Sequence, residues 1–155
     1  MSFSNTEPRL LPCWEAEVLI SKTRVNGPGP LGVRNVVPIT GGAFKGVLAP
    51  ESADPRPFQG VVLPGGFDLQ RERRDGVKEL EAIYHMQTDD GVTIEIRNHA
   101  MVVKDETGQP TYRRSHIRVE APEGPYAWLN TRFFLGTVES ARPGEMVIIR
   151  SFVAV

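Results

Sequence analysis

The stretch that decides the fold is GVKELEAIYHMQTDDGVTIEIRNHAMVV, residues 76–103. Its centre, residues 89–91 (Asp-Asp-Gly), has the composition of a tight hairpin turn, in which Gly supplies a positive φ. After the turn, apolar and polar residues alternate over residues 92–97, as in a strand with one buried face. Before the turn, residues 76–85 fit a helical stripe as well as a strand face. Because the hairpin turn follows directly, we predict that both arms are strands.

The rest of the chain repeats this pattern of short alternating runs separated by turn residues. Its 15 Gly and 13 Pro are spread in small clusters, and each cluster favours a turn because Gly allows positive φ and Pro fixes φ. The further turns are expected at residues 27–30, 41–42, 64–66, 123–125 and 142–144, and the further strands at residues 14–25, 43–49, 58–63, 116–120, 127–138 and 146–155.

This pattern of short strands separated by turns predicts the fold class. Eight to ten short strands without crossover helices favour a single antiparallel β-barrel of lipocalin-like architecture, because closure removes the exposed sheet edges. We expect one all-β domain over residues 1–155, in which residues 1–11 form an irregular N-terminal segment. With about eight strands, the interior of such a barrel can hold one small ligand.

Composition limits the partners and the compartment. The 155 residues are 40% hydrophobic and carry 18 basic and 19 acidic side chains, a net charge of -1. Such a balance gives no general attraction to nucleic acid or to a membrane surface, so we expect neither partner. Cys13, the one cysteine, has no predicted base partner and is interpreted as a core residue. With neither a signal peptide nor a membrane span of about 20 residues, the sequence predicts a cytoplasmic protein.

Polar side chains interrupt several faces that are otherwise apolar. Asn98 continues the alternating face of residues 92–97, Tyr84 shares a face with apolar neighbours, and Asn130 shares one with Trp128. A buried polar group without a hydrogen-bond partner costs about 1–3 kcal/mol. Two interpretations stay open: a satisfied network inside a solid core, or the wall of a pocket in which a few polar groups orient a ligand.

The densest local signal is LPGGFDLQ, residues 63–70. Its two glycines allow a sharp bend, after which Asp68 and Gln70 project on the same side of an extended segment. Asp68 could act as a general base if burial raised its pKa. The alternative is that its side chain only stabilises the turn.

Other charged and metal-ligating residues give weaker signals. The mixed charges of residues 70–75 are typical of a solvated surface, although one of these arginines could bind Asp68 or a substrate carboxylate. The basic spot at residues 112–114 is small for a nucleic-acid site on a neutral chain. His85 and His99 lie on the two arms of the hairpin, where they could approach each other, but their spacing matches no metal-binding motif. We therefore expect no metal and no cofactor.

Seven motifs along the chain, taken together, resemble a known family. They are Gly32-Val33-Arg34, PITGGAFKG (residues 38–46), VLPGGFD (residues 62–68), Arg73-Arg74-Asp75-Gly76, Tyr84, TDDG (residues 88–91) and YAWLN (residues 126–130). In this order they resemble the uncharacterised domain of unknown function 3237, over nearly the whole chain. The resemblance implies a small β-barrel without an assigned general activity.

The resemblance also implies a set of pocket residues: Arg34, Thr40, Asp68, Gln70, Arg73, Asp75, Tyr84, Asn98, Trp128 and Asn130. The chain departs from the family pattern at three places. Leu69 stands where a Trp usually follows the aspartate, Ile83 stands where an Arg commonly precedes the tyrosine, and residues 99–100 (His-Ala) stand where the segment usually ends in Gly. We expect these changes to reshape the pocket.

These observations lead to a hypothesis of function. We predict a small-molecule-binding barrel that acts as a cofactor-independent lyase or isomerase, with acid–base chemistry on a small, partly apolar compound, aromatic compounds included. Asp68 would be the base, Tyr84 the acid or oxyanion donor, and Arg34 or Arg73 the group that holds an anion. The substrate-binding residues would be Thr40, Gln70, Arg73, Asn98, Trp128 and Asn130.

The alternative hypothesis is a binding or carrier protein that leaves its ligand unchanged. Its Asp, Arg and Asn side chains would then serve only as hydrogen-bond anchors. A third interpretation, an interaction domain, needs a broad apolar outer face. Residues 146–155 are apolar on both faces and could form such an interface in a homo-oligomer.

Overall fold

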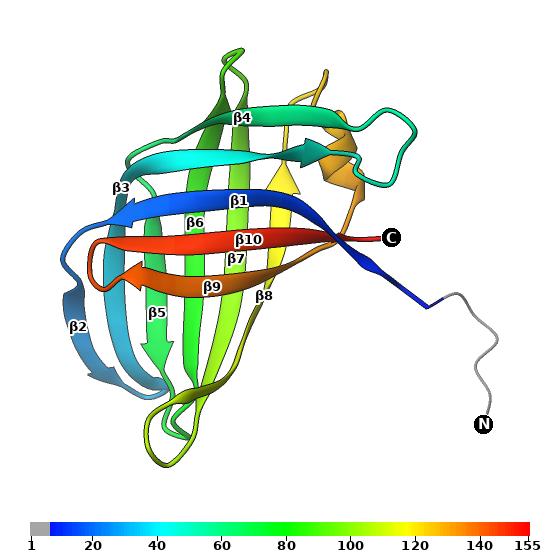
Figure 1. Cartoon of the computed structure of the whole chain (residues 1–155). Coiled ribbons are helices and arrows are strands. Elements are labelled where there is room, and N and C mark those ends of the chain that lie inside the picture. The colour runs from blue at the N-terminus through cyan, green and yellow to red at the C-terminus, as the bar shows by residue number, and fades with distance from the viewer. Residues whose placement is uncertain (1–6) are drawn as a thin grey trace.

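A computed structural model describes residues 7–155, and residues 1–6 lie outside the described part. The chain forms one antiparallel sheet that curls into a barrel (Figure 1). Its elements are β1 (Leu10–Ile20), β2 (Arg24–Gly29), β3 (Gly32–Leu48), β4 (Arg56–Val62), β5 (Phe67–Glu72), β6 (Lys78–Thr88), β7 (Thr93–Lys104), β8 (Pro110–Glu120), the 3-10 helix η1 (Ala127–Thr131), β9 (Phe134–Arg142) and β10 (Met146–Ala154).

Strand β1 closes the barrel, because it pairs with β10 along one edge and with β3 along the other. The long strand β3 pairs with four other strands along its length. On one edge it pairs with β5 in its first half and β4 in its second half, and on the other edge with β2 and then β1. The result is a closed eight-stranded barrel with two extra strands. The predicted all-β barrel is confirmed.

The central hairpin is confirmed in detail. Strands β6 and β7 pair without interruption from Lys78↔Val102 to Gln87↔Thr93. Gly91 has a φ of 87°, the positive value that the turn composition predicts. Residues 76–85 form no helix, because residues 78–85 pair with β7 and residues 78–83 also pair with β5.

The turn predicted at residues 41–42 is wrong, because both glycines lie inside β3. Their φ values are 149° and 138°, in the region that favours Gly. A Cβ on Gly42 would lie 1.9 Å from the carbonyl oxygen of Glu17, so only Gly lets β1 approach β3 here. The turn predicted at residues 27–30 is also displaced, since β2 continues to Gly29.

The strand predicted over residues 127–138 is wrong in its first half. Residues 127–131 form η1, whose Leu129 enters the core, and β9 begins only at Phe134. At the N-terminus, β1 begins at Leu10, within the segment expected to be irregular, while residues 1–6 of that segment lie outside the described residues. The run predicted at residues 14–25 is divided between β1 and β2.

A cluster of aromatic side chains fills one half of the barrel. Trp14 packs edge-on against Phe134 at 5.0 Å between ring centroids, and Phe44 lies 5.5 Å from Phe58. Edge-on pairs of this kind stabilise a core beyond the burial of their surface. The half that contains the β5–β6 and β7–β8 turns carries smaller side chains on its inner face. Among residues 7–155, no helix is long and apolar enough to cross a membrane.

Candidate functional site

The inner face of the barrel is hollow at the end opposite the aromatic cluster. The space that the centre of a water molecule can occupy there is about 80 Å³. A single water needs about 10–15 Å³ on this measure, so the cavity has room for several waters or for a small organic group. Its walls are Val18, Ile20, Val37, Ile39, Asp68, Gln70, Leu80, Ala82, Tyr84, Asn98, Ala100, Val138, Val147 and Ile149.

The register of three strands brings the polar residues of this wall together. Asp68 on β5, Ala82 on β6 and Asn98 on β7 are direct neighbours in the ladder. Side chains of paired residues lie on the same face of a sheet, so all three point inward. Because Ala82 is small, space is left between the carboxyl group of Asp68 and the amide of Asn98.

Asp68 is held through one oxygen and free at the other. The side-chain amide Nε2 of Gln70 donates to Oδ2 of Asp68 at 2.7 Å. Oδ1 is buried and has no hydrogen-bond partner among residues 7–155. Burial raises the pKa of the carboxyl group, an effect that the Gln70 hydrogen bond and the charge of Lys78 partly oppose. Asp68 therefore keeps its proton to a higher pH than an ordinary carboxyl group.

Tyr84 supplies a second buried group without a partner. The residue is 1% exposed, and its hydroxyl makes no hydrogen bond within residues 7–155. Burial raises the pKa of this phenol far above its usual value, so the hydroxyl stays protonated and can donate. The glycine-rich turn explains its position, because a Cβ on Gly66 would come within 2.6 Å of the Tyr84 Cβ.

Asn98 adds an amide to the wall, and Asn35 lies next to the wall residue Gln70. Asn98 is 4% exposed, and its Oδ1 is buried without a partner within the described range. Asn35 lies opposite Gln70 in the β3–β5 ladder, and its Oδ1 is likewise buried and unpartnered there. Asn35 is not among the residues predicted from the sequence. The signal was available, because Asn35 alternates with Val37 and Ile39 on the inner face of β3.

Arg34 and Thr40 do not line the cavity, so their predicted place in its wall is wrong. Arg34 follows the opposite face of β3 from its buried neighbour Asn35, and lies opposite Arg71 of β5. Thr40 is exposed and adjoins the buried Ile39. The alternation of β3 therefore turns both side chains away from the interior.

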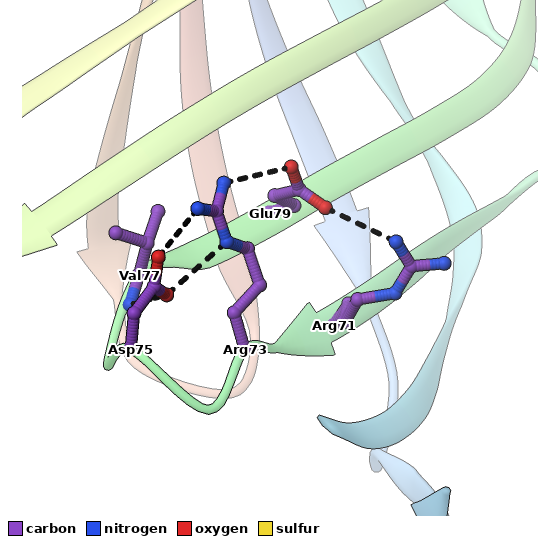
Figure 2. A network of polar contacts seen from close by, with 5 residues as sticks. All are labelled: Arg71, Arg73, Asp75, Val77 and Glu79. Atoms are coloured by element: carbon purple, nitrogen blue, oxygen red, sulfur yellow. Dashed lines mark hydrogen bonds and ion pairs between the residues drawn. The ribbon is translucent and has the colours of Figure 1, made fainter. Parts of the chain in front are cut away.

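Arg73 and Asp75 also lie outside the cavity, in an ion-pair network at the β5–β6 turn (Figure 2). Arg73 Nε donates to Asp75 Oδ1 at 3.1 Å, and the guanidinium lowers the pKa of the Asp75 carboxyl. Glu79 accepts from Arg73 and from Arg71, each at 3.4 Å. Exposed ion pairs of this kind stabilise little, and this network ties the turn rather than a substrate. Arg73 therefore does not lie in the cavity wall, where it was predicted.

Trp128 and Asn130 belong to η1 and lie at the aromatic end of the barrel. Trp128 packs against Phe134 at 6.1 Å and beneath the guanidinium of Arg132. Asn130 accepts a hydrogen bond from the Ala121 amide at 2.7 Å and donates to the Ala121 carbonyl at 2.8 Å. Both predicted pocket residues are therefore structural, and their assignment to the cavity wall is wrong.

The histidines do not meet in the way considered from the sequence. His85 pairs with Glu95 at 3.8 Å, whereas the ring of His99 lies 5.2 Å from that of His116. Among residues 7–155, no three His, Cys, Asp or Glu side chains are arranged to hold a metal ion. Cys13 is buried and its pKa is raised to about 12 by desolvation, as suits a core thiol.

The fold and this site define a class: a small closed antiparallel β-barrel, hollow at one end, with acidic, phenolic and amide groups on its inner wall. The family model described as "Protein of unknown function (DUF3237)" matches residues 8–154. The chain therefore belongs to this family.

Curated relatives are named UPF0311 proteins. A UPF0311 protein of Rhodopseudomonas palustris strain TIE-1 is 33% identical over 130 residues, which cover 76% of this chain and 78% of the relative. A UPF0311 protein of Clostridium acetobutylicum is 40% identical over 77 residues, 49% of this chain and 43% of the relative.

Solved structures share the barrel. A conserved protein of unknown function from Rhodopseudomonas palustris superposes with a TM-score of 0.81 at 28% identity, covering 97% of this chain and 100% of that one. A β-barrel-like protein from Acinetobacter baumannii gives 0.81 at 22% identity, with 99% and 100% covered. A structure described as an enzyme from Penicillium herquei gives 0.73 at 21% identity over the whole of both chains. The last two likenesses concern the fold alone.

Proposed function

We propose that this protein is a cofactor-independent lyase or isomerase that moves a proton on a small, partly apolar compound bound in the cavity. The observation that carries the proposal is the environment of Asp68. One carboxyl oxygen is fixed by Gln70, and the other is buried, unpartnered within the described residues and placed in an apolar wall. Burial of this kind moves the pKa of a carboxyl group toward the value that suits a general base or acid.

Tyr84 provides the complementary group. Asp68 lies opposite Ala82, and Tyr84 is two residues further along β6, so the two are diagonal cross-strand neighbours. A hydroxyl that stays protonated can donate a hydrogen bond to an oxygen on which negative charge develops. Asn98, on the same rung as Asp68, would orient the ligand through its free amide oxygen.

The proton transfers balance without any further reactant. The Asp68 carboxylate would take a proton from a carbon next to a carbonyl group, and the charge would move to the carbonyl oxygen, where Tyr84 donates. In an isomerisation, the same proton returns to a different carbon. In an elimination, a leaving group departs from the adjacent carbon, and the proton leaves with it or passes to water.

Solvent deuterium exchange tests this proposal before the substrate is known. The full chain would be incubated in D₂O with small ketones, β-hydroxy carbonyl compounds and aryl carbonyl compounds, and deuterium incorporation would be followed by mass spectrometry. We expect exchange at the carbon next to the carbonyl with the wild-type chain and none with Asp68→Asn. Equal exchange by both proteins would refute the role of Asp68.

A binding or carrier function is the second candidate, favoured by the three unpartnered polar atoms of the wall, on Asp68, Tyr84 and Asn98. Such atoms can anchor a ligand without transforming it. A compound that binds but neither exchanges deuterium nor changes mass would decide for this function. The Penicillium herquei structure, which shares the fold, is described as an enzyme and supports the catalytic candidate only in this general way.

We also propose, from the composition of the chain, that the protein is located in the cytoplasm. A further proposal is that residues 146–155 form the interface of a homo-oligomer. On the outer face of β10, Ile148 and Phe152 are half-buried, but Arg150 between them binds Glu15 at 2.8 Å and Glu139 at 2.6 Å. An interface there would have to cover these ion pairs. Light scattering of the purified chain measures the number of subunits directly.

A further inference from the structure

Next to the cavity, on the side of the β5–β6 turn, lies a rung of four paired residues of which three are charged. Moving from Leu80 toward the β5–β6 turn, the next inward position on β6 is Lys78, which pairs with Glu72 of β5 and Val102 of β7. Val102 pairs in turn with Arg113 of β8. Glu72, Lys78, Val102 and Arg113 thus form one rung across four strands.

The direction of the side chains in this rung follows from their neighbours. Val102 is buried at 6% exposure, so the rung belongs to the inner face. The next position on β6, Glu79, instead binds Arg71 and Arg73 on the outside of the sheet (Figure 2). Since side chains alternate along a strand, Lys78 points to the interior side. Its charge also acts on the Asp68 carboxyl.

Arg113 lies beside the cavity, where β8 faces β9. The ladder between β8 and β9 comprises three residue pairs, from Ser115↔Gly136 to Ile117↔Phe134. Beyond them the two strands diverge (Figure 1), and the half-buried Arg113 donates from Nη1 to the carbonyl oxygen of Val138 at 3.2 Å. Val138 is itself part of the cavity wall. This single contact leaves most of the guanidinium donors for another acceptor.

The charges of the rung do not cancel. Two cations face one carboxylate, Glu72, and the distance from Lys78 Nζ to Glu72 Oε1 is 3.9 Å, longer than a hydrogen bond. The outer arginines, Arg71 and Arg73, are already paired with Glu79 and Asp75. An excess of positive charge therefore lies on the inner face of the sheet next to an apolar cavity.

We propose that the ligand of this cavity is a small organic carboxylate, with its anionic group bound by Lys78 and Arg113 and its apolar body directed toward Tyr84. An ammonium and a planar guanidinium together match the two oxygens of a carboxylate. Lys78 lies four residues from Ala82 along β6, about 13 Å between Cα atoms, which sets the ligand to one ring or a short carbon chain. The inference rests on the cavity of the proposed function, but not on catalysis.

Paired acids and amides test the inference. Benzoate and butyrate would be titrated against benzamide and butyramide, and binding followed by NMR through the side-chain amide signals of Gln70 and Asn98, which lie in the wall. We expect each acid to bind at least about tenfold more tightly than its amide, because hydrogen bonds between charged groups are the stronger ones.

Charge-removing variants locate the contact. Lys78→Met should weaken binding of the acids about tenfold and leave the amides unchanged. Lys45→Met, on the outer face of β3, is the matched control and should change neither. Arg113→Met gives a second measurement, with folding checked by the dispersion of the amide spectrum.

Three results would overturn the inference: equal affinity for acid and amide, unchanged acid affinity in Lys78→Met, or no shift of either amide signal at millimolar acid. None of them depends on turnover. Loss of deuterium exchange with intact acid selectivity would instead overturn the catalytic proposal and leave the carboxylate site standing.

Discussion

Gln70 donates to Asp68 at 2.7 Å from a position two residues further along the same strand. The two side chains share the inner face of β5, so their contact is built into the strand and requires no loop to hold it. The bond fixes Oδ2, while Oδ1 is buried without a hydrogen-bond partner among residues 7–155. This arrangement orients a carboxyl group in an apolar wall.

Replacing Asp68 with Asn should abolish deuterium exchange and turnover, because the amide cannot accept a proton at neutral pH. The melting temperature should stay unchanged or rise, since the variant removes an ionisable group from a buried position. Exchange and thermal unfolding would be measured on the same preparation. Asp54→Asn, in an exposed loop, is the control. A large loss of stability would show that Asp68 serves the turn.

The stability of the protein should depend on pH through Asp68. The folded state keeps this proton above the ordinary carboxyl pKa of 3.8, so it binds more protons than the unfolded chain between the two pKa values. The contribution of Asp68 is therefore complete below about pH 3.8 and is lost as the pH rises through the raised pKa. In urea unfolding from pH 4 to pH 8, the free energy of unfolding of Asp68→Asn should increase relative to that of the wild type as the pH rises. A constant difference would contradict the raised pKa.

Tyr84→Phe should separate function from stability. The hydroxyl is buried without a partner among the described residues, so its removal should not lower the free energy of unfolding. If it donates to a developing oxyanion, the exchange rate should fall about 10²-fold. Tyr112→Phe, at an exposed position, provides the comparison. An unchanged exchange rate would remove Tyr84 from the mechanism.

Ala82→Leu should close the cavity. The added carbons enter the space between Asp68 and Asn98, so ligand binding should be lost. The cost in stability should remain about 1–3 kcal/mol, the usual range for overpacking. Ala43→Leu, an exposed position on β3, adds the same volume outside the barrel and should leave binding unchanged. Retained binding in Ala82→Leu, measured through the Gln70 signal, would place the ligand elsewhere.

Asn130→Ala should destabilise the fold and spare the cavity. The change removes two hydrogen bonds to the Ala121 backbone, and the free energy of unfolding should fall by about 1–3 kcal/mol. Affinity for a cavity ligand should not change below the unfolding transition. The exposed Asn26→Ala serves as control for unfolding. Weaker ligand binding without loss of stability would show that Asn130 contributes to the ligand site.

The central hairpin could be predicted from the sequence because its turn composition and its alternation agree. The same alternation placed Asp68, Gln70, Tyr84 and Asn98 on inward faces, and the structure brings all four to one cavity. Lys78 could have been found in the same way, since it continues the face of Leu80 toward the turn.

The remaining errors have physical causes. Gly41 and Gly42 look like a turn, but they serve a close approach between two strands, which depends on residues far away in the chain. Because a turn was predicted there, the first half of β3 was not predicted as a strand. The alternation that turns Arg34 and Thr40 outward was therefore not predicted either. In η1, residues 127–131 carry an alternation like that of a strand, and the hydrogen bonds of Asn130 to Ala121 override it.

The pairing of β1 with β10 has a consequence for synthesis of the protein. The edge of β1 that pairs with β10 (residues 10–19) stays unpaired until residues 146–154 have been synthesised. Contacts this distant in sequence slow folding, and a nascent chain on the ribosome would expose an uncapped edge of β1 until the last strand emerges. Any truncation that removes β10 should therefore yield aggregates, whatever the state of the cavity.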